Sequence, residues 1–341
     1  MRTGKNPAKN GLPAYTPQPI GVALITYIPF TEGYFEQSLE IFGYQLASLK
    51  ASTTQPFDLL VFDNGSCPQV VSRLKELHDE KQIDWLILSR HNMGKAGAWN
   101  WIFASMPNEL ICYADSDVLF RPGWLEASLQ VLGTFPQAGM VGAQPNFYDV
   151  MQGAGTAHLP LLKTGNYQLG EFLPDKELID EYCLGIGASD ELAAQFHANP
   201  LPVIIHQESG VKAVLGASHM QFIIPRQVAR QVVPLPATKG LLRAETMSLD
   251  YRIDELGYLH LSTTISYVFH MGNTITEHLL NELTAVTASP SAPRQTREPS
   301  TRKASPLQRW LALLAKRPRF QRLFLRLYNL LFRALYAENS D

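Results

Sequence analysis

Short apolar runs alternate with helix-like stretches over residues 21–147, and this alternation restricts the possible folds more than any other feature of the sequence. The apolar runs are continuous, which is typical of strands buried on both faces of a parallel sheet. Strands are expected at 21–27, 58–63, 85–88 and 110–114, and helices at 33–51, 70–78 and 95–105. Such alternation predicts an α/β fold in which helices cover both faces of a mostly parallel central sheet.

Polar residues follow three of these predicted strands at the point where each strand ends. They are Thr26 with Tyr27, Asp63 with Asn64, and the triplet Asp115-Ser116-Asp117. In open α/β sheets, ligands bind beyond the carboxyl ends of the strands. The three clusters are therefore expected to converge on one ligand site at one edge of the sheet.

Asp115 and Asp117 flank a small residue, so both carboxylates can face one site from a turn. Oxygen ligands without thiolates suit Mg²⁺ or Mn²⁺, and Mg²⁺ is commonly held by one or two carboxylates together with substrate phosphates. A cation there would act as a Lewis acid that neutralises charge on a leaving diphosphate. The alternative is a solvated acidic turn, and the position after a buried strand favours the metal site.

Two further segments are suited to a nucleotide. The carboxylate of Asp63 can accept a hydrogen bond from a base, or it can bond its own turn. Residues 92–100 open the helix after the third strand, where Gly94 and Gly97 allow close backbone approach and the helix N-terminus favours anions. Lys95 adds positive charge toward a diphosphate. An ordinary loop and helix start is the alternative for this segment.

The second half of the sequence is less regular. Residues 144–210 are rich in Gly, Pro and polar residues, and they predict an insertion or an acceptor-side subdomain. The elements expected here are a helix at 189–197, a strand at 211–215, a helix at 242–256 ending at Gly257, and an alternating strand at 258–269. His270 follows the last of these strands.

In combination, the motifs resemble inverting glycosyltransferases of family 2, which have the nucleotide-diphospho-sugar transferase (GT-A) fold. The matching pieces are Thr26, Asp63-Asn64-Gly65-Ser66, Asn92-Met93-Gly94 with Gly97 and Asn100, Asp115-Ser116-Asp117, Gly216-Ala217-Ser218, and Arg252-Ile253 with Gly257-Tyr258. They extend over residues 21–273, about three-quarters of the chain.

The resemblance implies a role for each matching piece. Asp63 would bind the nucleotide, Asp115 would contact the ribose or a metal-bound phosphate, and Asp117 would ligate Mn²⁺ or Mg²⁺. His270 would be a further ligand of the metal or the diphosphate, with a plain strand-end hydrogen bond as the alternative. The expected donor-binding set is Thr26, Tyr27, Asp63, Asn92, Gly94, Lys95, Asn100 and Asp115, the metal set is Asp115, Asp117 and His270, and the acceptor-side set is Gly216, Ala217 and Ser218.

The catalytic base is where the sequence departs from the family pattern. The family usually has Glu-Asp some turns before the arginine and glycine of its last helix. Counting back from that arginine, Arg252, places Glu245 and Thr246 there. Glu245 could serve as the base, and so could Asp250, one helical turn beyond Thr246 on the same face. A base must lie within about 3 Å of the acceptor hydroxyl, and without one the enzyme would be inactive or use another mechanism.

Charge is unevenly distributed along the chain. The net charge of −2 does not suggest a nucleic-acid binder, but residues 294–341 contain eleven Lys or Arg and three Asp or Glu. Within 306–336, apolar residues recur at three- and four-residue steps among arginines, and Pro318 divides the segment into two predicted helices. A basic amphipathic helix with Trp and Phe predicts an interfacial membrane anchor. Docking on its own domain or on a partner chain is the alternative.

The expected domains are a polar arm at 1–20, a catalytic domain at 21–284 with donor half 21–147 and acceptor half 148–284, a flexible linker at 285–305, and the basic tail at 306–341. No apolar signal region precedes the first strand, and no run of about 18 apolar residues could span a bilayer. The three cysteines fit neither a disulfide framework nor a zinc pattern. A cytoplasmic protein, peripheral on the inner face of the cell membrane, is therefore expected.

The expected reaction is a direct displacement with inversion, in which a hydroxyl of a glycan or lipid-linked acceptor attacks the sugar of a nucleotide-diphosphate donor. A sugar-phosphate nucleotidyltransferase shares the α/β layout, but its Gly-rich, Arg-bearing loop should follow the first strand, where residues 26–31 have neither Gly nor Arg. The remaining alternative is a non-enzymatic, membrane-bound protein on a degenerate transferase fold, which Thr246 supports.

Overall fold

A computed structural model of the chain describes residues 3–6, 11, 14–147, 158, 161–236, 244–288 and 301–303. The strands are β1 (Ile20–Thr26), β2 (Phe57–Asp63), β3 (Trp85–Leu88), β4 (Leu110–Asp115), β5 (Val118–Phe120), β6 (Ala138–Gly142), β7 (Tyr167–Phe172), β8 (Leu201–His206), β9 (Lys212–Leu215), β10 (Gln221–Pro225), β11 (Leu259–Ser262), β12 (Val268–His270) and β13 (Thr301–Lys303). The helices are η2 (Gly33–Phe35), α1 (Ser38–Ser52), α2 (Pro68–Asp79), α3 (Gly94–Ser105), α4 (Trp124–Thr134), η3 (Leu161–Thr164), α6 (Lys176–Ile186), α7 (Asp190–Ala198), α8 (Arg226–Val232), α9 (Ala244–Glu255) and α10 (Glu277–Ala288).

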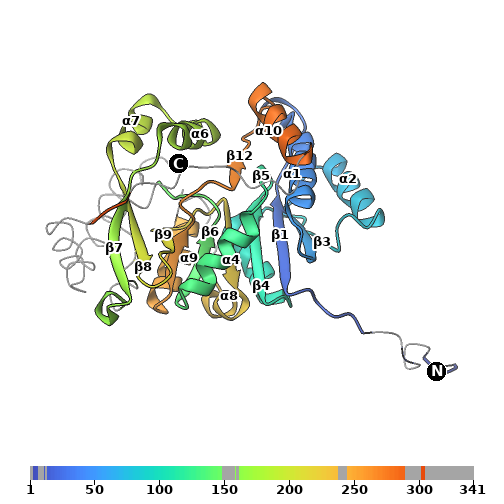
Figure 1. The fold of residues 1–341 in the computed structure, drawn as a ribbon. Coiled ribbons are helices and arrows are strands. Elements are labelled where there is room, and N and C mark those ends of the chain that lie inside the picture. Colours follow the sequence, from blue (N-terminus) through green and yellow to red (C-terminus); the bar gives the residue numbers. More distant parts are fainter. Residues whose placement is uncertain are drawn as a thin grey trace, which may run out of the picture.

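Most of the described strands belong to one mixed sheet, in the order β13-β7-β8-β9-β11-β6-β10-β4-β1-β2-β3, and β5 pairs with β12 in a smaller sheet (Figure 1). β1 is parallel to β2 and β4, and β2 is parallel to β3. β10 is inserted antiparallel between β4 and β6, and β11 is parallel to β6. The predicted α/β fold with a mostly parallel central sheet is confirmed, and β9, β8, β7 and β13 extend it with antiparallel pairings.

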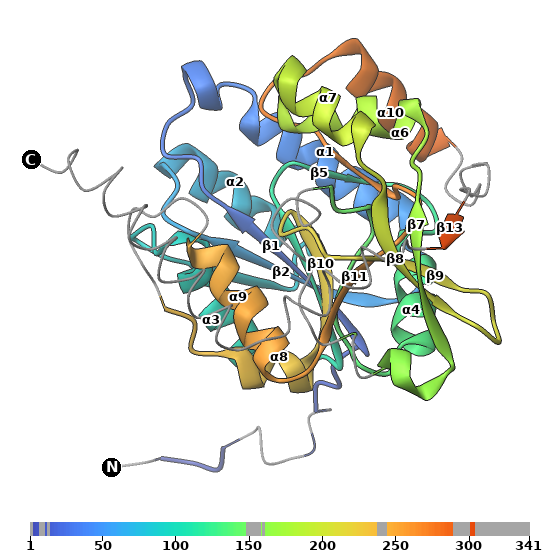
Figure 2. The same cartoon turned by 90° about the vertical axis from the view of Figure 1, so that its left-hand side faces the viewer.

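A hydrophobic core lies on each face of the central sheet. Along β1, Val22 and Leu24 belong to the core that α1 and α2 cover, whereas Ala23 and Ile25 belong to the core that α3, α8 and α9 cover. Figure 2 shows these two groups of helices on opposite sides of β1 and β2. Burial of alternate side chains on both faces explains why the strand sequence is apolar throughout.

The segment at 144–210 contains more regular structure than its sequence indicates. The helix expected at 189–197 is α7, and its N-cap Ser189 accepts a hydrogen bond from the backbone N–H of Leu192. The unexpected helix α6 begins after Asp175, whose Oδ1 accepts from the N–H of Leu178 at 2.9 Å. Asp and Ser are preferred N-cap residues because they satisfy otherwise unpaired N–H groups, so both helices carried a local signal.

The single strand expected at 258–269 is wrong. The chain forms β11 in the main sheet and then β12 in the smaller sheet, antiparallel to β5. Between them, the Oγ1 of Thr263 donates to the carbonyl of Ile265 at 2.7 Å, and the N–H of Tyr267 donates to the carbonyl of Ala143 at 2.8 Å. Alternating polarity continues through this break, so the pattern does not reveal the change of partner.

The predicted linker and tail are described only in part. Helix α10 runs to Ala288, into the predicted linker, and the three residues of β13 pair with β7. The predicted amphipathic tail at 306–341 lies outside the described residues. Within the described part of the chain, no helix is long and apolar enough to cross a membrane.

Candidate active site

The strand ends expected to converge do lie together. β1 and β2 are in register so that Thr26 stands opposite Asp63, and Ile25 stands opposite Asp115 on β4. The Oγ1 of Thr26 donates to the Oδ1 of Asp63 at 3.2 Å, and both side chains are fully buried. Asp115 ends β4 and Asp117 directly precedes β5, so the acidic triplet connects the two sheets.

The carboxylate of Asp115 is bonded by two side chains of the protein, one cationic and one phenolic. The ammonium of Lys95 lies 2.7 Å from its carboxylate, and the hydroxyl of Tyr113 also donates to it. Burial, with the charge of Asp115 and the hydrogen bond to it, raises the pKa of Tyr113 well above its usual value, so that phenol remains a donor. Lys95 thus neutralises Asp115 as well as adding charge at the start of α3.

Asp117 differs from Asp115 because one of its oxygens has no protein partner. Its Oδ1 is buried without a hydrogen bond, and its Oδ2 lies 3.4 Å from the Nε2 of His270. Burial raises the pKa of Asp117, with a further contribution from Asp115, and the opposing charges of His270, when its ring is protonated, and of Lys95 do not offset it. A buried carboxylate oxygen without a partner is costly, and a divalent cation ligated by Asp117 and His270 would satisfy it.

His270 is oriented for such a role. Its Nδ1 lies 2.6 Å from the carbonyl oxygen of Gly185 in α6. Because a carbonyl only accepts, Nδ1 carries the hydrogen, and in the neutral ring Nε2 keeps its lone pair toward Asp117. The antiparallel pair of β12 and β5 places His270 opposite Val118, and the N–H of Met271 donates to the carbonyl of Asp117 at 2.8 Å.

Replacement of Gly185 by Ala is expected to displace His270. A Cβ at this position would lie 2.8 Å from the carbonyl oxygen of His270 and 3.0 Å from its Cβ. Loss of an outer-shell partner of a metal ligand typically lowers metal affinity 10–100-fold, and titration calorimetry with Mn²⁺ should show a loss in this range. Gly43→Ala is the control, because a Cβ there meets no atom within 4 Å. Equal Mn²⁺ affinities of the two variants would contradict the orientation of His270 by Gly185.

The loops after β2 and β3 are joined by one asparagine. The side chain of Asn64 donates to the Oδ1 of Asn92 at 3.1 Å and accepts from the N–H of Met93 at 2.9 Å, while Asn92 accepts from the N–H of Gly94 at 2.8 Å. Asp63 accepts from the backbone N–H of Ser66 at 3.2 Å, so it does bond its own turn. Its contact with a nucleotide base stays a prediction, as do the donor roles of Asn92 and Gly94.

Asn100 makes a structural contact with the segment after α8. Its Nδ2 donates to the carbonyl of Leu235 at 2.8 Å, and its Oδ1 accepts from the N–H of the same residue at 2.7 Å. Both ends of the amide therefore fix this segment against α3. The donor-binding role expected for Asn100 stays a prediction. Tyr27 follows β1 and is 39% exposed, which leaves it accessible to a ligand.

The predicted acceptor-side loop lies directly beside Asp115. Gly216, Ala217 and Ser218 connect β9 to β10, and Gly216 has a φ of 120°, which favours glycine. The N–H of Asp115 donates to the carbonyl of Met220 at 2.8 Å at the end of this loop. His219 lies between Ser218 and Met220 and was not predicted as a site residue. Its Nε2 lies 2.9 Å from the Oδ1 of Asp250 on α9.

Only one of the two predicted base candidates is described in full. Asp250 lies on α9 with its side chain 26% exposed. Glu245 belongs to the same helix, but its side chain lies outside the described part of the chain. Its role as a base stays a prediction.

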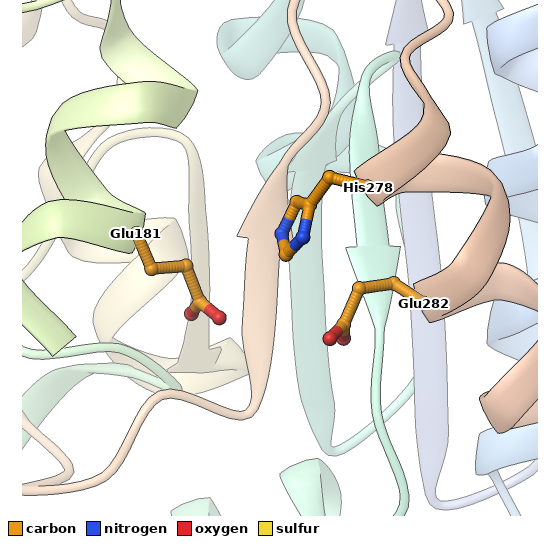
Figure 3. A group of neighbouring side chains, drawn as sticks. All are labelled: Glu181, His278 and Glu282. Carbon is orange, nitrogen blue, oxygen red and sulfur yellow. The ribbon is translucent and has the colours of Figure 1, made fainter. Parts of the chain in front are cut away.

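A second group of possible ligands comes from α6 and α10. Glu181, His278 and Glu282 place their ligand atoms within 4.8 Å of one another (Figure 3). The guanidinium of Arg121 bonds both carboxylates, with Glu181 at 2.8 and 2.9 Å and Glu282 at 2.8 Å. Arg121 follows β5 and its side chain is 4% exposed, so its charge already compensates the two carboxylates. The group acts as an ion-pair network that ties both helices to the smaller sheet.

One family model matches the part of the chain that contains the acidic triplet. Residues 40–187, which include both carboxylates of the acidic triplet, match the model of glycosyl transferase family 2. None of the curated proteins compared with the sequence matches it. The family match and the α/β sheet agree with the GT-A fold that the resemblance implies.

Two solved structures are similar to parts of this chain or to most of it. One is the mannosyltransferase PcManGT from Pyrobaculum calidifontis in complex with GDP-Man and Mn²⁺, with 12% identity, coverage of 95% of this chain and 89% of that chain, and a TM-score of 0.45. The other is S. aureus TarS 1-349 in complex with UDP-GlcNAc, with 17% identity, coverage of 37% of this chain and a TM-score of 0.30. The match spans 34% of that TarS chain.

Proposed function

We propose that this protein is a glycosyltransferase that moves a sugar from a nucleotide-diphosphate donor to a hydroxyl acceptor by metal-assisted inverting displacement. The observation that carries the proposal is the pairing of Asp117 with His270, in which a buried carboxylate oxygen lacks a partner beside an imidazole lone pair. Asp117 follows β4, which is parallel to β1, at the strand ends where open α/β sheets bind ligands, and His270 reaches it from β12, which pairs antiparallel with β5. The match of residues 40–187 to a glycosyltransferase family supports the same class.

On the donor side, separate groups of residues would bind the nucleoside and the metal. Thr26, Tyr27 and Asp63 would bind the nucleoside beyond β1 and β2, while Asn92 and Gly94 shape the start of α3. Asp117 and His270 would hold Mn²⁺ or Mg²⁺, with Asp115 next to them. The cation supplies Lewis-acid neutralisation of the diphosphate charge when it is bound.

On the acceptor side, the loop of residues 216–218 would receive the attacking hydroxyl. The acceptor oxygen bonds to the anomeric carbon, and the bond from that carbon to the diphosphate breaks on the opposite face. The proton of the hydroxyl must pass to a base of the protein, since its loss makes the oxygen a better nucleophile. Asp250 and Glu245 are the carboxylates that the sequence offers for this step, and His219 lies next to the first of them.

Thermal unfolding of the full chain tests the donor site. With Mn²⁺ and saturating UDP, GDP or their sugar derivatives, tested singly, one nucleotide should raise Tm by roughly 5–10 °C, because a ligand at 100 times its Kd stabilises by about 2.7 kcal/mol. The rise should vanish with a chelator or with the nucleoside monophosphate. Release of a nucleoside diphosphate would then identify sugar transfer, whereas a nucleotidyltransferase would release pyrophosphate. Failure of every nucleotide to raise Tm with Mn²⁺ would contradict the proposal.

The basic tail is proposed to place the enzyme at a membrane surface, where lipid-linked or surface-glycan acceptors are found. Each Lys or Arg near an anionic surface contributes about 1 kcal/mol, and residues 306–341 contain seven of them. The full chain should float with liposomes that contain an anionic lipid, and a chain ending at Ser305 should remain in the dense fraction. Equal flotation of the two chains would show that the tail is not the anchor.

A further inference from the structure

His219 and Asp250 form a pair close to Asp115. Neither residue belongs to those proposed to bind the metal or the nucleotide. His219 lies in the loop between β9 and β10, and its Nε2 is 2.9 Å from the Oδ1 of Asp250. The side chains are 23% and 26% exposed, respectively, so the pair is shielded but still reachable from solvent. His260 approaches the same carboxylate oxygen at 4.0 Å from the buried side.

Two contacts fix the loop of His219 to the acidic triplet. The N–H of Asp115 donates to the carbonyl of Met220 at 2.8 Å. The ammonium of Lys95, which bonds the carboxylate of Asp115, lies 3.3 Å from the carbonyl of His219. The imidazole therefore belongs to a backbone segment that is bonded to the donor side and carries the predicted acceptor loop at residues 216–218.

Asp250 is suited to orient this imidazole. Burial acts to raise the pKa of Asp250, but the charge of the protonated His219 ring and its hydrogen bond, with a contribution from His260, outweigh it and lower the pKa. Asp250 is therefore ionised beside the protonated ring, and an ionised carboxylate only accepts hydrogen bonds. The Nε2 of His219 must carry the donated hydrogen, which makes Nδ1 the basic nitrogen of the neutral ring.

We propose that His219 is the general base of the transfer and that Asp250 is a positioning residue that holds its ring. The inference rests on the proposed function. The Nδ1 of His219 takes the proton of the acceptor hydroxyl while the acceptor oxygen bonds to the anomeric carbon. The bond from that carbon to the diphosphate oxygen breaks, and its electron pair leaves with the diphosphate. The resulting imidazolium faces the carboxylate of Asp250, which stays ionised throughout.

The base is tested by a variant that keeps the hydrogen bond to Asp250. In His219→Gln the side-chain amide can still donate to Asp250 but cannot take a proton. With Mn²⁺, release of nucleoside diphosphate from UDP-glucose, UDP-N-acetylglucosamine or GDP-mannose, with water as acceptor, should fall about 100-fold or more. The affinity for UDP or GDP with Mn²⁺ should stay within about threefold of the wild type, since the base does not bind the leaving group.

His197→Gln is the matched control. His197 also pairs with an aspartate, its Nε2 lying 3.1 Å from Asp180, but on α7 and exposed. It should release nucleoside diphosphate at the wild-type rate. Release by His219→Gln at a rate within about threefold of the wild type overturns the assignment. If the wild-type chain binds no nucleoside diphosphate with Mn²⁺, the proposed function fails, which is a different outcome from a fully active His219→Gln.

The tautomer can be measured without a substrate. Long-range ¹⁵N–¹H correlation spectra of the ¹⁵N-histidine-labelled full chain should show His219 with a protonated Nε2 and an unprotonated Nδ1, its signals being those missing in His219→Gln. Asp250→Asn should abolish that preference, because an amide can accept or donate. A protonated Nδ1 in the neutral wild-type ring would overturn the proposal independently of any activity.

Discussion

Asp117→Asn should lose Mn²⁺-dependent nucleotide binding and yet unfold at the same or a higher temperature than the wild type in the absence of metal. Asn keeps the shape of the side chain but removes one anionic ligand, which Mn²⁺ and Mg²⁺ require. The affinity for UDP or GDP with Mn²⁺ should therefore fall at least about 100-fold. Titration calorimetry with and without Mn²⁺ measures this loss.

The stability of the metal-free variant should change in the opposite direction. In the folded chain the pKa of Asp117 is raised, so its ionised form opposes folding at neutral pH and this cost disappears as pH falls through the raised pKa. Asn carries no charge, and its metal-free form should be more stable by up to about 1 kcal/mol at pH 7. Calorimetric unfolding in chelator at pH 7 checks this.

Asp79→Asn is the charge-matched control, because Asp79 is exposed at the end of α2 with its side chain 85% accessible. It should change neither the metal-dependent affinity nor Tm. Wild-type nucleotide affinity in Asp117→Asn would remove Asp117 from the metal site. A large fall in its metal-free Tm would instead show that the carboxylate stabilises the fold.

Arg121→Met is expected to cause the largest loss of stability. Its guanidinium bonds Glu181 and Glu282, and its side chain is only 4% exposed. Burial acts to lower the pKa of Arg121, but the two carboxylates outweigh burial and raise the pKa above its usual value. Removal leaves two carboxylates without a counter-charge, and breaking a buried pair in this way typically costs about 3–5 kcal/mol. Denaturant unfolding followed by circular dichroism measures the change.

Arg73→Met is the matched control, since Arg73 pairs with Glu76 on the exposed face of α2 at 2.9 Å. An exposed pair contributes about 0–1 kcal/mol. The triple variant Arg121→Met, Glu181→Gln, Glu282→Gln should recover most of the lost stability, because no buried charge remains. Failure to recover it would assign the loss to packing against Phe269, over whose ring the guanidinium lies at 5.7 Å.

The first half of the fold could be predicted because its signals are local. The strands β1, β2 and β4 are buried on both faces and mostly apolar, β3 is an apolar strand at the sheet edge, and the parallel order of these strands brings Thr26, Asp63 and Asp115 to one edge. The antiparallel strands of the second half depend on partners far away in the sequence. The change from β11 to β12 is one example, because a period of two residues says nothing about which sheet a strand joins.

The site was predictable to the extent that its residues end strands. Asp117 was predicted from its position after a strand and His270 from the resemblance to a family, and the structure places their side chains 3.4 Å apart. Three residues were missed because their importance comes from tertiary contacts: His219 with Asp250, Gly185 with His270, and Arg121 with Glu181 and Glu282. Conversely, Asn100 carries a family-like motif but is engaged by the backbone of Leu235.

The insertion of β10 between β4 and β6 means that the two halves are not separable modules. A cut of the chain after residue 147 would remove the strand that joins β4 to the rest of the sheet, and it would separate Asp117 from His270 on β12. Neither fragment would then contain a whole binding site. Domain exchange with a protein of the same fold would need to transplant both halves together, because the boundary between them passes through the candidate site and not beside it.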